Sequence, residues 1–123
     1  MKLITKDIRD RLIENGRAQA LVKGTEDERD FFPVVKFFNP AGAATWLITE
    51  MDPDEPDILF GLCDLGMGCP ELGSVRLSEL QSVRGPLGLG IERDVMFEAT
   101  HPLSAYARAA REAGAIVTHL PRD

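Results

Sequence analysis

Apolar residues recur at helical spacing near both ends of the chain. The first run follows Thr5, whose side chain suits a helix N-cap, and Gly16 offers a stop; it comprises Ile8, Leu12 and Ile13. The second run follows Pro102, which suits a first helical turn, and ends at Gly114. Its buried stripe would consist of Leu103, Tyr106, Ala107 and Ala110. The pattern predicts a short N-terminal helix and a C-terminal helix, each packing one apolar stripe inward.

Between these helices the chain carries short β-type runs separated by turn residues. The runs are PVVKFF (33–38), TWLITEM (45–51), DILFGLCDL (57–65), LGSVRL (72–77) and the alternating segment 91–97. NPAGA and DPDEP read as turns, and the charged stretch at 24–30 reads as a solvated loop. We therefore expect an α+β fold with a mostly antiparallel sheet of four to five strands. Both helices should pack on it within a single domain spanning residues 1–123.

The DPDEP turn gives a specific register for the central hairpin. If Asp52 pairs with Asp57, then Trp46 lies opposite Cys63, Ile48 opposite Gly61 and Glu50 opposite Leu59. The other face, which carries Leu47, Thr49, Met51, Ile58, Phe60 and Leu62, is the more apolar of the two. We expect that face to lie on the core and the Trp46 face to be partly covered or to form a groove.

One candidate binding site follows from pairing the first two strands through NPAGA. With Phe38 opposite Ala44, Lys36 lies beside Trp46 and on the same face as Glu50. A lysine, an indole and a carboxylate on one face form either a structural ion pair with a cation–π contact or a small polar binding site. Glu71, which lies in the glycine-rich loop before Gly73, completes the set of candidate binding residues.

The loop between Leu65 and Gly73 is rich in glycine, which the backbone conformation of the loop can explain. Glycines at 66, 68 and 73 permit left-handed backbone, and such loops can also bind an anion or a metal. Neither GxxxxGK[ST] nor GxGxxG opening a helix is present, so a conformational role for the glycines is favoured.

A second functional class, a metal-dependent hydrolase or nuclease, would need several acids to converge. Lys36 would polarise a water in such a site, and the candidate acids are Glu50, Asp64, Glu71, Glu92 and Asp94. Because the chain has 20 acidic residues among 123, such sets also arise by chance. We predict no metal and no cofactor, and the sequence favours a non-enzymatic protein over an enzyme.

The cysteines and histidines show no catalytic or zinc pattern. Cys63 and Cys69 fit no common zinc spacing with His101 and His119, and GxSxG is absent. We interpret both cysteines as free thiols and as buried small apolar residues.

Charge and hydropathy narrow the class of partner. A net charge of −6 and a pI near 4.9 argue against direct nucleic-acid binding, which needs a dense Lys/Arg surface. No apolar run reaches the length of a membrane span, and the charged N-terminus lacks the apolar region of a signal peptide. We therefore expect a cytoplasmic protein without membrane contact, suited to basic partners.

The combination of PVVKFFNP, TWLITE, FGLCDLG, PELG and IERD resembles a family of small bacterial proteins of unknown function encoded on plasmids and other mobile elements. The resemblance covers roughly residues 3–113 and implies a mobile-element setting. It implies no activity, cofactor or catalytic residue. We expect a non-enzymatic accessory protein that binds a protein partner, and homodimerisation through an edge strand stays open.

Overall fold

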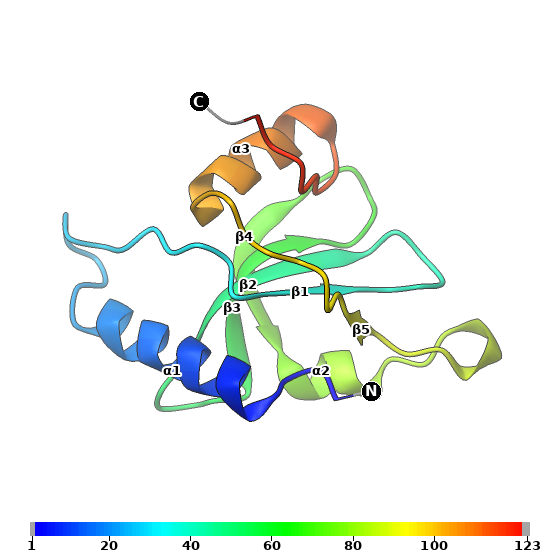
Figure 1. The fold of residues 1–123 in the computed structure, drawn as a ribbon, viewed down its shortest axis with the longest axis horizontal. Coiled ribbons are helices and arrows are strands. Elements are labelled where there is room, and N and C mark those ends of the chain that lie inside the picture. The colour runs from blue at the N-terminus through cyan, green and yellow to red at the C-terminus, as the bar shows by residue number, and fades with distance from the viewer. Residues whose placement is uncertain (1, 122–123) are drawn as a thin grey trace.

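The computed structural model describes residues 2–121 and contains one five-stranded sheet with helices on both sides (Figure 1). Along the chain the elements are α1 (Lys6–Ala20), β1 (Val35–Phe38), β2 (Thr45–Met51), β3 (Ile58–Asp64), β4 (Glu71–Arg76), α2 (Leu77–Ser82), the 3-10 turn η1 (Pro86–Gly88), β5 (Glu92–Arg93) and α3 (Leu103–Ala113). The strand order is β4-β3-β2-β1-β5, and every neighbouring pair is antiparallel. The predicted α+β fold is confirmed.

Helix α1 begins as predicted but does not end at Gly16. Thr5 caps it by accepting a hydrogen bond from the Ile8 amide, 3.2 Å away, and the helix continues to Ala20. Gly16 is buried, and a Cβ atom there would lie 1.9 Å from the carbonyl oxygen of Met51. The glycine therefore permits close contact between helix and strand.

The central hairpin confirms part of the predicted register. Trp46 lies opposite Cys63 and Ile48 opposite Gly61, but the register then shifts. Glu50 pairs with Phe60, so the prediction that it faces Leu59 is wrong. An extra residue in β2, a β-bulge at Thr49, is the physical reason, because it reverses the alternation of every later side chain.

The prediction that the Leu47 face lies on a core is confirmed, but the prediction that the Trp46 face is only partly covered or forms a groove is wrong. The larger apolar cluster lies on the Trp46 face, and residues of α1 and α2 belong to it. Besides Trp46 it includes Leu12, Val35, Phe37, Ile48, Met51, Leu59 and Leu80. Only 5% of Trp46 is exposed. Leu47 and Leu62 lie on the other face, under α3, which is on the opposite side of the sheet from α1 and α2 (Figure 1). Both faces are buried because the sheet is a middle layer.

The C-terminal elements differ in how well they match expectation. Helix α3 buries the predicted stripe of Leu103, Tyr106, Ala107 and Ala110, and Gly114 ends it in the left-handed conformation at φ 77°. Strand β5, in contrast, has two residues instead of the predicted segment 91–97. It stops because Asp94 forms a turn, in which its carboxylate accepts a hydrogen bond from the Met96 amide and its carbonyl oxygen accepts one from the Phe97 amide.

Candidate functional site

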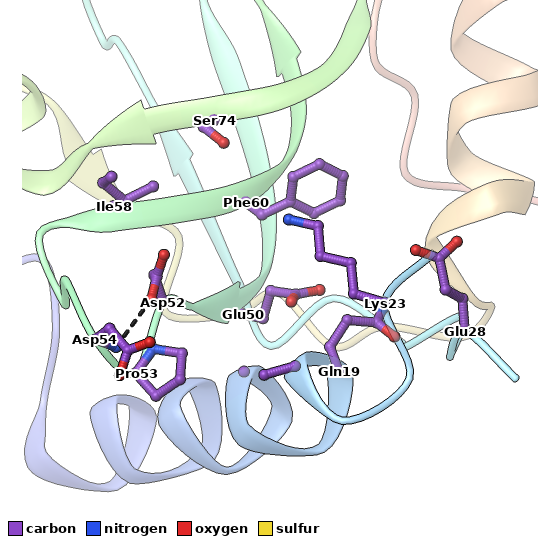
Figure 2. Close-up of a pocket in the computed structure, with 12 residues that line it drawn as sticks. Gln19, Lys23, Glu28, Glu50, Asp52, Pro53, Asp54, Ile58, Phe60 and Ser74 are labelled. Carbon is purple, nitrogen blue, oxygen red and sulfur yellow. Dashed lines mark hydrogen bonds between the residues drawn. The ribbon is translucent and has the colours of Figure 1, made fainter. Parts of the chain in front are cut away.

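A cleft of about 300 Å³ lies where the C-terminal end of α1 crosses the end of the sheet (Figure 2). Its walls come from α1 and the following turn, the β2–β3 turn, and the faces of β3 and β4. The lining residues are Gly16, Gln19, Ala20, Lys23, Glu28, Glu50, Asp52, Pro53, Asp54, Ile58, Phe60 and Ser74.

Two local features of the sequence build this cleft. Gly16 lets α1 approach Met51 closely, which brings the last turn of the helix over the sheet end. The bulge at Thr49 then turns Glu50 to the same face as Phe60. Asn15 supports the bulge, because its side-chain amide donates to the Thr49 carbonyl oxygen at 2.9 Å. The irregularity in β2 therefore positions the cleft carboxylate.

The cleft combines acidic walls with an apolar floor. Four acids line it, namely Glu28, Glu50, Asp52 and Asp54, against a single cation, Lys23. Phe60, Ile58 and Pro53 supply apolar surface. Figure 2 shows the Lys23 side chain directed into the cleft on the side of Glu50 and Phe60.

Glu50 is the titratable group that burial affects most clearly in the cleft. Burial raises its pKa because the charged form loses hydration, while a hydrogen bond from Gln19 and the positive charge of Lys23 offset part of that effect. Thr49 also lowers the pKa by hydrogen bonding, whereas the negative charge of Glu28 raises it. A cation placed in the cleft would favour the charged form of Glu50.

The loop after α1 is exposed, as predicted, but it is anchored at several points. The Gln19 side chain binds the Arg29 backbone twice, donating to its carbonyl oxygen and accepting from its amide, each at 2.8 Å. Asp30 accepts hydrogen bonds from the backbone and hydroxyl of Ser104 at the start of α3. These contacts hold the Glu28 wall of the cleft in place.

The cleft continues along the α3 face of the sheet toward β4. A second hollow shares Gln19, Glu28, Glu50 and Phe60 with it. This hollow adds Phe31, Leu72, Leu103 and Ser104, among others. The two hollows form one groove that runs from the β2–β3 turn to the outer strand.

The predicted Lys36–Trp46–Glu50 constellation does not form. Phe38 pairs with Thr45, one residue away from the predicted Ala44, so Lys36 lies opposite Leu47 and on the other face from Trp46. Its ammonium group instead pairs with Asp94, with 3.3 Å between Nζ and Oδ2.

The acids proposed for a metal site are dispersed. Asp64 is 2% exposed and accepts hydrogen bonds from the amides of Gly66 and Ile116, at 2.8 and 2.9 Å. Glu71 is exposed at the start of β4, Glu92 lies in β5, and Asp94 directly follows β5. Within residues 2–121, no group of three or more His, Cys, Asp or Glu side chains could hold a metal ion.

The cysteines are both free, but their environments differ. Burial raises the pKa of the Cys63 thiol to about 11, which leaves it protonated and a poor nucleophile at neutral pH. Cys69 is exposed, so its predicted burial is wrong. It sits in the loop where Gly66 and Gly68 both have positive φ, as expected for a conformational role.

Sequence reasoning found Glu50 but missed the rest of the cleft. Glu28 lies in the stretch 24–30 that the sequence predicts to be a solvated loop, and Lys23 directly precedes it. Asp52 and Asp54 lie in the predicted DPDEP turn. The buried Gly16 was the available signal, because a glycine within a helical run indicates close packing of another backbone.

Comparison with known proteins gives a family without an assigned activity. Residues 3–117 match the family described as "Protein of unknown function (DUF2958)". No curated protein and no solved structure matches the chain. Within the described part of the chain, no helix has the length and apolar character needed to cross a membrane.

Proposed function

We propose that this chain, which belongs to the DUF2958 family of proteins of unknown function, is a non-enzymatic interaction protein that binds a basic protein partner through its acidic cleft. The observation that carries the proposal is the composition of the cleft, in which four acids and one lysine surround an apolar floor.

This composition suits the side chain of an arginine or a lysine. Such a side chain has an aliphatic stem, which can lie on Phe60 and Pro53, and a cationic end, which can face the carboxylates. Hydrogen bonds between a guanidinium or ammonium group and a carboxylate are stronger than neutral ones. The net charge of −6 would also speed encounter with a basic surface.

The sequence resemblance adds a biological setting to the proposal. It suggests an accessory protein of a mobile genetic element, acting in the cytoplasm. A partner with a basic, nucleic-acid-binding surface would be complementary to the cleft, and occupying that surface would modulate the partner. The metal-dependent hydrolase gains no support, because the acids that it requires are spread over separate parts of the fold.

The test is affinity capture from a host lysate with two charge-matched variants. Glu28→Gln combined with Glu50→Gln removes two charges from the cleft. Glu79→Gln combined with Glu112→Gln removes two exposed charges from α2 and α3. The wild type and the control should retain the same basic protein at low salt and release it at high salt, whereas the cleft variant should not retain it. Equal capture by both variants, or capture of no basic protein, would refute the proposal.

A further inference from the structure

Strand β4 forms a free edge of the sheet next to the cleft. It stands at the end of the strand order, and within residues 2–121 no further strand lies beyond it (Figure 1). It spans six residues, and all of its side chains are exposed or half-buried. A free edge of this length presents a row of unpaired backbone groups.

The hydrogen-bonding pattern identifies which residues carry these groups. The Ile58 carbonyl oxygen accepts a hydrogen bond from the Asp52 amide at 3.0 Å. The backbone N–H and C=O groups of even-numbered β3 residues are therefore directed toward β2. Odd-numbered residues of β3 therefore bond to β4, where Gly61 lies opposite Gly73. By the same alternation, Leu72, Ser74 and Arg76 direct their N–H and C=O groups outward.

The edge lacks the features that commonly prevent strand addition. Pairing of β3 with β4 is continuous over six residue pairs, without a bulge, and the sequence ELGSVR contains neither proline nor lysine. The one cation, Arg76, lies at the end of the strand and pairs with Glu55 and Asp57. The middle of the edge, at Gly73 and Ser74, carries only small residues.

The free edge and the cleft are continuous. Ser74 lines the cleft and lies opposite Phe60, and Leu72 lines the adjoining hollow. The side chain of a residue added opposite Ser74 would point to the same face of the sheet. The backbone of the added strand would lie two strand spacings, roughly 10 Å, from β3. Only a long side chain can cross the small Ser74 to reach the Phe60 ring and the acidic wall.

We propose that an extended segment of the partner protein adds to β4 as a sixth strand and places an arginine or lysine side chain, opposite Ser74, in the acidic cleft. This inference rests on the proposed function and specifies its binding mode. The backbone hydrogen bonds would supply affinity, and the charge of the cleft would select the basic residue. Leu72 would receive an apolar side chain two positions along the added strand.

The test is a selection of displayed random peptides on the immobilised protein, followed by affinity measurements on a selected peptide by fluorescence anisotropy. The selected peptides should share one basic residue within an alternating apolar pattern. Ser74→Pro removes the central outward N–H of β4 without removing a hydrogen bond to β3, and prolines are tolerated at such edge positions. Ser74→Ala keeps that N–H and serves as the control.

Ser74→Pro should weaken binding at least about tenfold, because one hydrogen bond is lost and a peptide carbonyl is left unpaired. Ser74→Ala should bind as the wild type does, and circular dichroism should show that both variants are folded. Equal binding by Ser74→Pro and Ser74→Ala would overturn strand addition. Selected peptides without a basic residue, or no selected peptide at all, would also overturn the inference.

Two results separate this binding mode from the proposed function. If lysate capture depends on the cleft acids but not on the Ser74 amide, strand addition fails and the acidic interaction protein stands. If Ser74→Pro converts a dimeric wild type to a monomer in sedimentation analysis, a second copy of the chain occupies the edge and the partner segment is refuted.

Discussion

At the scale of single residues, Glu50 connects the fold to the proposed function. A bulge places this carboxylate beside Phe60, and burial raises its pKa. The folded state therefore holds the Glu50 proton more firmly than the unfolded state does. This linkage stabilises the fold fully below the unfolded pKa, and the contribution is lost as the pH rises through the folded pKa.

Replacing Glu50 with glutamine should remove this pH dependence. In Glu50→Gln we expect a higher midpoint of thermal unfolding than in wild type at neutral pH, because a partly buried charge is gone. The difference should shrink at pH values below the ordinary glutamate pKa. Lys23, Glu28, Asp52 and Asp54 also face the cleft and remain in place. Thermal unfolding over a pH series measures the difference in midpoint between the wild type and Glu50→Gln. Glu79→Gln, which removes an exposed charge, is the control. A constant offset between the wild type and Glu50→Gln at every pH would contradict this role of Glu50.

At the scale of elements, the contact between α1 and β2 determines where the cleft forms. A Cβ atom at Gly16 would lie 1.9 Å from the Met51 carbonyl oxygen and 3.0 Å from its carbon. Both are backbone atoms, which cannot rotate away as a side chain can. The helix must shift to accommodate any larger residue.

Gly16→Ala should therefore destabilise the fold, although alanine is the better helix former. Overpacked substitutions cost about 1–3 kcal/mol, which exceeds the roughly 1 kcal/mol gain in helix propensity. The free energy of unfolding in urea provides the measurement. Gly73→Ala is a matched control, because nothing lies within 4 Å of a Cβ atom there. A Gly16→Ala variant as stable as the control would show that the close contact is unimportant.

The sequence predicts the elements better than it predicts how they pair. Helix α3 was predictable because its apolar stripe and its Gly114 cap agree with each other. The bulge was not, because Thr49 and Met51 fit either face of β2 equally well. The register of the first hairpin differs from the predicted one by one residue. The Asn39 amide donates to the Ala44 carbonyl oxygen, which leaves Phe38 opposite Thr45.

The candidate site was harder to predict because its position depends on how the strands pair and on which face of the sheet stays open. Both faces of the sheet are apolar, so hydrophobic pattern cannot decide which one carries a groove. The cleft also draws its acids from a loop and a turn, where sequence gives no periodicity. Only Glu50, which lies in a strand, was identified.

At the scale of the whole molecule, an acidic cleft and a free sheet edge lie next to each other on one side of a layered fold. The family match gives no function against which to weigh this arrangement. From its chemistry we propose a ligand with a cationic side chain and an aliphatic stem. If the cleft binds such a ligand, it should prefer the cationic group to an uncharged group of the same shape.

A titration of the ¹⁵N-labelled protein with N-acetyl-argininamide, followed by NMR, tests this preference most directly. N-acetyl-citrullinamide, which has the same shape without the charge, is the control ligand. We expect saturable shifts of the Gln19, Glu50 and Phe60 amides with the arginine ligand, and loss of those shifts in Glu50→Gln. Equal responses to both ligands, or shifts that do not include these amides, would contradict this expectation.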